Sequence, residues 1–183
     1  MARELRYQPL PKDRTWWRVA EVNWKDPLSP AFSRVSGGRW NSPGAIATLY
    51  LNADRQTARC NVRAFIESSP YEPEDLRDEA APILVGCRLP REQVVCDVHT
   101  NAGLLAAGLP DTYPLDAQGC TVGHSTCQDI GKQVKFERKR GVHTRCAKSS
   151  NPDDLELAWF PASTRSVARE VARHSFSDWF WER

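Results

Sequence analysis

The stretch RVSGGRWNSPG occupies residues 34–44, and residues 48–51 then read Thr-Leu-Tyr-Leu, an apolar segment that predicts a β-strand. Three glycines, a proline and an asparagine surround one Arg-Trp pair in residues 34–44. A turn needs glycine where φ is positive or where another group approaches the backbone closely. An arginine and an indole fixed beside such a turn offer an anion clamp and a flat stacking surface, so this stretch is a candidate binding site.

The composition is that of a globular protein. The chain has 183 residues, of which 40% are hydrophobic and 26% are charged, and these values fit one domain with a buried core. It contains no run of eighteen apolar residues, and its first six residues lack the apolar centre of a signal peptide. We therefore expect a cytoplasmic protein without membrane association. The six cysteines are then expected to be reduced thiols.

The net charge gives no indication of a nucleic-acid partner. It is +2, which is too small for recognition through bulk electrostatics, so we expect no nucleic acid to bind. One basic cluster lies on a predicted helix and its end, where we interpret it as a solvated face, and it comprises Lys132, Lys135, Arg138, Lys139 and Arg140.

Strands and helices are predicted in a mixed order without regular βαβ alternation, which favours an α+β fold. Apolar runs predict strands over residues 15–20, 47–51, 83–89, 94–98, 142–146 and 155–160. Helices are predicted over residues 54–68, 102–107, 125–139 and 166–174, and loops over 24–36, 70–81 and 110–123. The first helix should begin at an N-cap, Asp54, and bury Ala58, Val62, Phe65 and Ile66. Aromatic residues near the C-terminus are expected to pack on the body or on a partner: Phe176, Trp179, Phe180 and Trp181.

This order of motifs resembles the RES domain family, which is named for conserved Arg, Glu and Ser residues. The resemblance covers roughly residues 15–160. It predicts a single RES-like domain over residues 1–183, with residues 161–183 as a C-terminal aromatic helix and tail. The segments that carry it are Trp17-Arg18-Val19, residues 37–44, the strand at 49–51, residues 57–62, residues 141–148 and the strand that ends at Trp159-Phe160.

The resemblance implies a fold, a substrate and a partner. RES proteins are similar in fold to ADP-ribosyltransferases, with mixed or antiparallel sheets and flanking helices. They act as toxins that consume NAD by phosphorolysis or hydrolysis, or that ADP-ribosylate a target, and an antitoxin encoded alongside commonly neutralises them. For this chain the resemblance implies NAD as substrate, a cognate antitoxin or further copies of the chain as partners, and no metal.

The family's functional positions can be followed along this sequence. The family arginine corresponds to Arg18 and the family tyrosine to Tyr50. The glutamate position lies eleven residues after that tyrosine, where this chain has Asn61, and the serine position holds Cys146. These four residues are the candidate catalytic set. The candidate NAD-binding set comprises Arg18, Gly38, Arg39, Trp40, Asn41 and Tyr50.

The two replaced positions matter chemically. Cleavage of the nicotinamide–ribose bond passes through an oxocarbenium-like state, which a nearby carboxylate can stabilise. Asn61 can hydrogen-bond a ribose hydroxyl but carries no negative charge, and loss of one such electrostatic contact typically costs about 10²–10³ in rate. Cys146 could supply a nucleophilic thiolate if Arg145, Lys148 or His143 lowered its pKa. Arg18 and Arg39 remain permanent cations that can hold a pyrophosphate.

Three hypotheses follow from these residues. In the first, the chain still cleaves NAD, and another carboxylate, for which Glu67 and Glu21 are candidates, compensates for Asn61. In the second, the chain is a catalytically impaired pseudoenzyme that binds a nucleotide or a protein partner. In the third, the pocket has acquired another reaction that uses Cys146.

A zinc site is a separate alternative. Cys and His are suitable zinc ligands, and four of five residues could close a tetrahedral site. The spacing is irregular and contains no paired Cys-x-x-Cys, so we predict no metal. The five residues are Cys120, His124, Cys127, His143 and Cys146.

Overall fold

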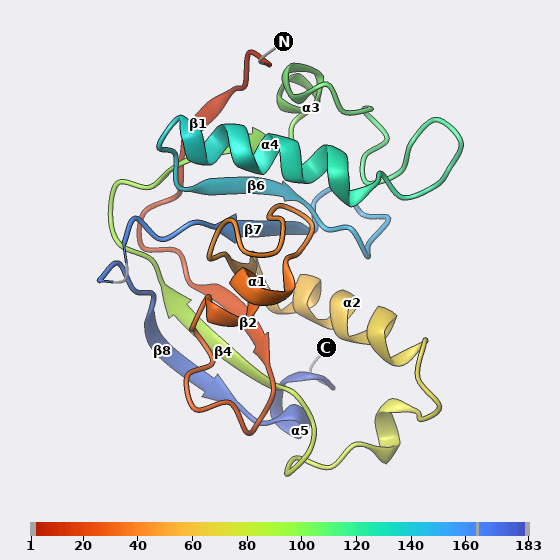
Figure 1. Ribbon diagram of the computed structural model, residues 1–183. Coiled ribbons are helices and arrows are strands. Elements are labelled where there is room, and N and C mark those ends of the chain that lie inside the picture. Colours follow the sequence, from red (N-terminus) through yellow and green to blue (C-terminus); the bar gives the residue numbers. More distant parts are fainter. Residues whose placement is uncertain (1–2, 164, 182–183) are drawn as a thin grey trace.

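The computed structural model describes residues 3–163 and 165–181, and within them the chain forms eight strands and five α-helices (Figure 1). The strands are β1 (Tyr7–Pro9), β2 (Trp16–Ala20), β3 (Leu49–Asn52), β4 (Ile83–Arg88), β5 (Val94–Val98), β6 (Gly141–Arg145), β7 (Leu155–Trp159) and β8 (Arg169–His174). The helices are α1 (Ala31–Ser36), α2 (Arg55–Ile66), α3 (Asn101–Ala107), α4 (His124–Phe136) and α5 (Phe176–Trp179), with a 3₁₀ turn, η1 (Pro73–Asp75).

All eight strands belong to one mixed sheet, which confirms the predicted α+β class. Their order is β1-β5-β6-β7-β3-β2-β4-β8, and every neighbouring pair is antiparallel except the parallel pair β5 and β6. β7 therefore lies in the interior of the sheet, hydrogen-bonded to β6 on one side and to β3 on the other.

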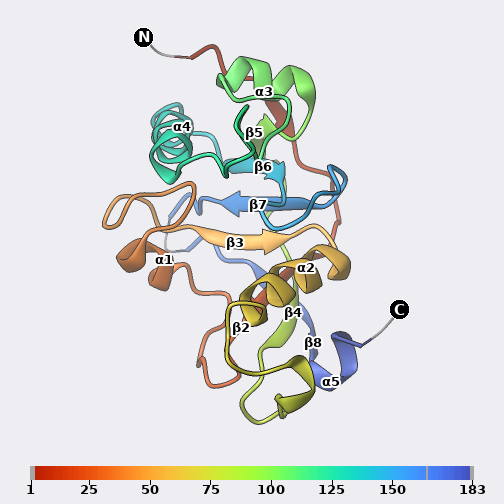
Figure 2. The same cartoon turned by 90° about the vertical axis from the view of Figure 1, so that its right-hand side faces the viewer.

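The sheet opens between β2 and β3. Among the described residues their register is the single pair Trp17 and Asn52, whereas β2 pairs with β4 along its whole length, from Trp16 to Ala20. Figures 1 and 2 show the result: β6 and β7 lie along one axis across the molecule, with β3 along the same axis in Figure 2, while β2, β4 and β8 cross that axis obliquely. The two strands separate beyond Trp17, and the backbone oxygen of Tyr50 accepts a hydrogen bond from the Arg18 side chain there instead of from β2.

Helices cover the two halves of the sheet separately (Figure 2). α3 and α4 pack over β5 and β6, and α2 packs over β2 and β3. The side-chain carboxylate of Asp54 accepts a hydrogen bond from the Thr57 backbone N–H at 2.7 Å, which confirms the predicted N-cap of α2. Phe65 is 64% exposed, so the prediction that it joins the buried face of α2 was wrong.

The C-terminal region differs from its prediction. Residues 169–174 form the edge strand β8 on β4 rather than a helix. An edge strand leaves one side unpaired, and charged residues such as Arg169, Glu170 and Arg173 suit that position. The aromatic side chains after it pack on the body: Phe176, Trp179 and Phe180 are buried in a cluster with α2 and Leu84. Strand β1 and helix α1 were not predicted.

Within the described residues, no helix combines the length and the apolar character that crossing a membrane requires.

His143 on β6 makes the stability of this fold sensitive to acid. Its side chain is 4% exposed, and burial, with the neighbouring charges of His99 and Arg14, lowers its pKa to about 3. An unfolded chain binds a proton at this histidine near its ordinary pKa of about 6.5, so the histidine's contribution to stability is present above that pH. The contribution is lost as the pH falls from about 6.5 towards about 3.

We expect the free energy of unfolding to decrease by about 2 kcal/mol between about pH 7.5 and about pH 5 through His143 alone. Urea denaturation of the wild type and of His143→Asn at both pH values measures this. Asn is the control replacement because its side-chain oxygen can accept the hydrogen bond that Gln8 Nε2 gives to His143 Nδ1 at 3.1 Å. If the free energy of unfolding fell equally in the wild type and in His143→Asn, the acid sensitivity would not come from His143.

Candidate active-site cavity

The hydroxyl of Tyr50 holds the glycine-rich turn against β3. It accepts a hydrogen bond from the Trp40 backbone N–H at 2.9 Å and donates one to Asn41 Oδ1 at 2.7 Å. A Cβ atom at Gly38 would lie 2.5 Å from the same hydroxyl oxygen, so a residue without a side chain is required there. The Tyr50 hydroxyl is thus engaged within the protein, and the ring is what this residue presents to its surroundings.

Trp40 and Asn41 are structural residues in this turn. The Trp40 side chain is 1% exposed and packs in the core beside Tyr113, so the expectation that its indole offers a stacking surface for a ligand was wrong. Asn41 is fully buried, and its amide donates to the backbone oxygens of Ser33 and Ile46 at 2.7 and 3.0 Å. Both residues fix the shape of the turn.

Arg39 lies beside the cavity rather than in its lining. Its guanidinium donates to the backbone oxygen of Val122 at 3.0 Å and ties the turn to the loop before α4. From α4, Gln128 Nε2 donates to the backbone oxygen of Gly38 at 2.9 Å. The turn is therefore fixed from two sides.

A cavity of about 160 Å³ occupies the place where β2 and β3 separate. Its lining includes three of the four candidate catalytic residues predicted from the sequence, Arg18, Tyr50 and Asn61, together with one acidic residue that was not predicted. Its lining comprises Arg18, Val19, Tyr50, Leu51, Asn52, Asn61 and Glu156.

Arg18 brings an unneutralised positive charge to this cavity. Its Nη1 donates to the backbone oxygen of Tyr50 at 2.8 Å, and its guanidinium lies 5.6 Å from the ring centre of Trp24. Within residues 3–163 and 165–181, it forms no ion pair, and its buried Nε has no hydrogen-bond partner. Burial lowers the pKa of Arg18 to about 10, so the side chain is still a cation at neutral pH.

Glu156 is the acidic residue that sequence reasoning missed. It lies on β7 directly opposite Asn52 of β3. Asn61 Nδ2 donates hydrogen bonds both to Glu156 Oε1 and to Asn52 Oδ1, the latter at 2.8 Å. Cys146 Sγ lies 3.5 Å from the same Glu156 oxygen. The two positions at which this chain departs from the family pattern thus both contact one carboxylate.

A match to a family model decides the classification. The model of the RES domain covers residues 15–180. The chain belongs to the RES domain family. Among solved structures, a chain of the M. tuberculosis MbcT–MbcA toxin–antitoxin complex is similar to this RES chain, with a TM-score of 0.71 and 21% identity over 91% of this chain and 88% of that chain. At that identity the likeness shows a shared fold. No curated protein matches the chain.

Cys146 of this RES chain is not a thiolate. Burial raises its pKa, and the adjacent Glu156 carboxylate raises it further. Arg145, which the sequence offered as an activating cation, donates instead to the backbone oxygens of His99, Asp111 and Tyr113. The condition under which Cys146 could act as a nucleophile, a lowered pKa, is therefore not met, and the thiol is placed as a neutral hydrogen-bond donor to Glu156.

The residues of the alternative zinc site do not come together. Among the described residues of the RES chain, no group of three or more His, Cys, Asp and Glu side chains is arranged to hold a metal ion. His143 packs against Trp16 and His99, whereas Cys146 contacts Asn61 and Glu156.

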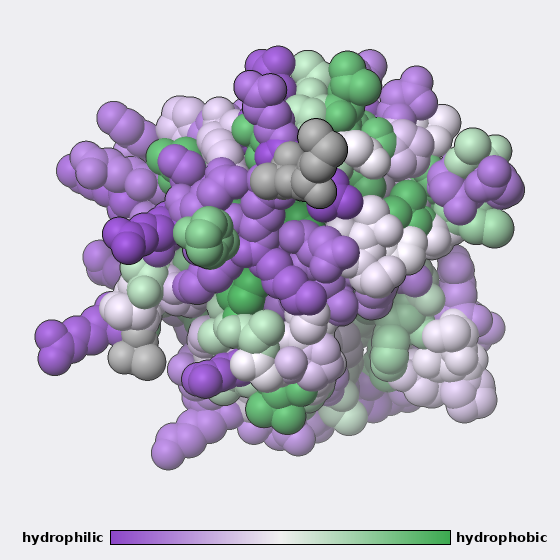
Figure 3. Space-filling model, turned by 45° about the horizontal axis from the view of Figure 1, so that its top comes forward, coloured by the Kyte–Doolittle hydropathy of each residue, from purple (hydrophilic) through white to green (hydrophobic). Residues whose placement is uncertain are grey.

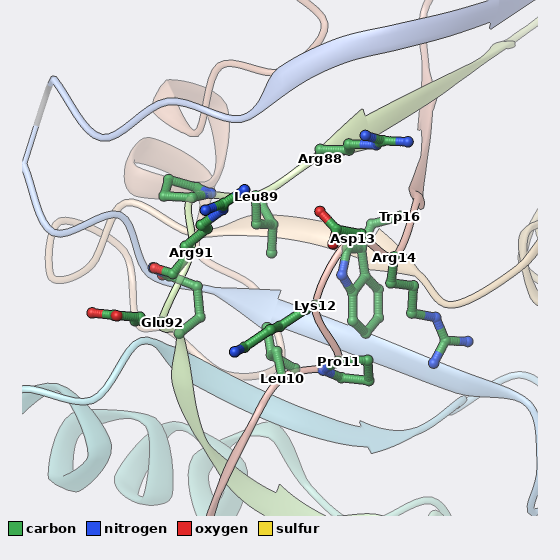
Figure 4. Close-up of a pocket in the computed structure, with 12 residues that line it drawn as sticks. Leu10, Pro11, Lys12, Asp13, Arg14, Trp16, Arg88, Leu89, Arg91 and Glu92 are labelled. Carbon is green, nitrogen blue, oxygen red and sulfur yellow. The ribbon is translucent and has the colours of Figure 1, made fainter.

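A second hollow lies at the turns around residues 10–16 and 88–93 (Figure 4). It has a volume of about 50 Å³, and Figure 4 shows the side chains of Lys12, Arg14 and Arg88 pointing in different directions. Their charges do not converge on one point, so this hollow does not resemble a site for an anion.

Proposed function

We propose that this RES chain is a toxin-type enzyme that binds NAD and cleaves its nicotinamide–ribose bond. The observation that carries the proposal is one cavity lined both by an arginine on β2, without an ion-pair partner among the described residues, and by a carboxyl group on the interior strand β7. The arginine can hold a phosphate of the substrate, and a carboxylate can stabilise positive charge on the ribose.

The cavity and the groove beside it suit an elongated substrate whose reactive end enters the cavity. Small-molecule sites commonly enclose about 300–1,000 Å³, so the cavity alone is too small for a dinucleotide. A groove of about 340 Å³ shares Val19 and Asn61 with it and continues along α2 past Phe65 and Tyr71. The nicotinamide riboside end of NAD would enter the cavity, and the rest of the dinucleotide would follow the groove.

The proposed reaction breaks the bond between ribose C1′ and the nicotinamide nitrogen. The bonding electron pair goes to the nicotinamide ring, which leaves as a neutral molecule, and C1′ becomes an oxocarbenium-like cation. Water, phosphate or a protein side chain then forms the new bond to C1′ and releases its proton to the solvent. The chain's own residues bind the phosphates, orient the ribose and stabilise the cation.

We propose a cognate antitoxin as partner and the cytoplasm as location. The support for the partner is the solved structure described above, which belongs to a toxin–antitoxin complex. Figure 3 shows a mostly hydrophilic face with separate small hydrophobic areas, which suits a protein that is exposed to water when its partner is absent. Self-association of the chain stays a prediction.

Proton NMR of NAD mixed with the purified chain tests the proposed activity. We expect release of nicotinamide by the wild type, and a comparison with and without phosphate separates phosphorolysis from hydrolysis. ADP-ribose appears in water alone if the enzyme is a hydrolase, and a phosphorylated ADP-ribose appears if phosphate is the acceptor.

Two outcomes would overturn the proposal in different ways. NAD signals that broaden without nicotinamide release would identify a nucleotide-binding pseudoenzyme. Neither release nor binding would exclude NAD as the ligand of the cavity and favour a pocket with another reaction.

A further inference from the structure

Three neutral donors surround Glu156. Asn61 on α2 donates through its amide, Cys146 after β6 donates through its thiol, and the backbone N–H of Ala147 donates as well. A carboxylate removed from water needs such donors, because burial of an unpaired charge is costly. Within the described part of the chain, Glu156 forms no ion pair with a lysine or an arginine. Neutral donors therefore hold this carboxyl group in place, no direct contact with a cation neutralises it when it is ionised, and burial raises its pKa.

Glu156 is also incompatible with the glutamate that the family pattern has at position 61. A glutamate at position 61 would place a second carboxylate at hydrogen-bond distance from Glu156, and two such groups cannot both be ionised. An uncharged amide at position 61 removes that repulsion and satisfies Glu156 and Asn52 with its two hydrogens. The residues at positions 61, 146 and 156 therefore form one consistent set.

We infer that Glu156 is the catalytic carboxylate of this chain, and that Asn61 and Cys146 are positioning residues that hold it towards the cavity. This inference rests on the proposed function, since it assigns a role in NAD cleavage. The negative charge that the resemblance places on α2 is supplied here from β7, across the same cavity. Glu156 makes no covalent bond in this role; it stabilises the cation that forms at ribose C1′ when nicotinamide leaves.

The carboxylates named from the sequence do not fill this role. Glu67 is exposed at the C-terminal end of α2, and Glu21 is exposed on the connection after β2. Neither lines the cavity that contains Arg18, whereas Glu156 does.

The first test is Glu156→Gln, which keeps an acceptor oxygen for Asn61 and removes the charge. We expect kcat to fall by about 10²–10³, with KM changed by less than about threefold, because the charge acts on the transition state. An unchanged melting temperature and unchanged NMR line broadening of NAD show that fold and binding persist. Glu67→Gln is the matched control, and its kcat should equal that of the wild type.

The pH dependence of kcat gives a readout that a structural role would not affect. Burial raises the pKa of Glu156, so wild-type kcat should decrease as the pH falls through that raised value. The titratable or charged groups facing Glu156 are Cys146, Tyr50, Arg39 and Arg18. Burial raises the pKa of Cys146 and of Tyr50 and lowers that of Arg18 only to about 10, so none of these three groups titrates in the acidic range. The residual kcat of Glu156→Gln should not decrease as the pH falls through this range.

Asn61→Glu separates this inference from simple loss of the family glutamate. We expect no gain in kcat, because the new carboxylate and Glu156 share one site and hold a proton between them. In the Glu156→Gln background, the same change restores a single carboxylate, and kcat should recover at least about tenfold.

Wild-type kcat in Glu156→Gln, or an Asn61→Glu single variant that exceeds the wild type, would overturn the role of Glu156 and leave the proposed function intact. Absence of nicotinamide release by the wild type would refute the proposed function itself.

Discussion

Replacement of Arg18 by methionine is expected to reduce kcat/KM for NAD by about 10- to 100-fold. The guanidinium is a cation without an ion-pair partner among the described residues, and it borders the cavity directly. Hydrogen bonds to charged groups contribute about 1.5–3 kcal/mol, and the upper value corresponds to about a 100-fold change. Methionine keeps much of the side chain's length while it removes the charge and every donor. Steady-state kinetics of nicotinamide release measures the effect.

Arg14 offers a matched control for this experiment. Its guanidinium also donates to a backbone oxygen, that of Ala53 at 3.1 Å, and also lies over an indole, that of Trp16 at 4.9 Å. It does not line the cavity. Arg14→Met should therefore lose comparable local contacts and keep wild-type kcat/KM. If both variants lost activity equally, the loss would reflect the fold and the binding role of Arg18 would be wrong.

Replacement of Gly131 by alanine is expected to destabilise the protein by about 3 kcal/mol, because overpacking of a dense interior forces backbone shifts. Gly131 lies on the buried face of α4, and a Cβ atom there would be 1.9 Å from the backbone oxygen of Trp40. The obstacle is backbone, so rotation of a side chain cannot relieve it. Urea denaturation should show a lower midpoint with an unchanged slope.

The neighbouring residue provides the comparison for Gly131. Lys132 is exposed on the same helix, so Lys132→Ala should change stability by less than about 0.5 kcal/mol. A Gly131→Ala protein as stable as the wild type would show that α4 and the glycine-rich turn are not held in tight contact.

Local signals predicted α2 well and the C-terminal segment poorly. The start of α2 depends on one side chain, Asp54, that bonds a backbone group three residues away, so nearby residues determine it. Residues 166–174 carry apolar side chains at spacings that fit either a helix or an edge strand. Residues 169–174 form a strand because they pair with β4, whose residues lie more than eighty positions earlier in the sequence.

In the candidate site, too, local sequence signals identified some residues and missed a residue whose contacts are distant in the sequence. Arg18 and Tyr50 lie on strands that apolar patterns predict, and their place in the family motif identified them. Glu156 occurs in the sequence Leu-Glu-Leu-Ala-Trp, where strand alternation puts it on the face opposite Leu155, Leu157 and Trp159. A charge on that face is ordinarily solvated. Its neighbours Asn52 and Asn61 become visible only when β7 is placed beside β3 and under α2.

The interior position of β7 has a consequence for the order of events during synthesis. Arg18, Tyr50 and Asn61 leave the ribosome before Glu156, which lies on β7, the strand that joins β3 to β6. The nascent polypeptide therefore cannot assemble the cavity until the sheet closes around its last interior strand. A chain that stops before β7 would lack both Glu156 and the connection between the two halves of the sheet, so the cavity and the sheet are completed together.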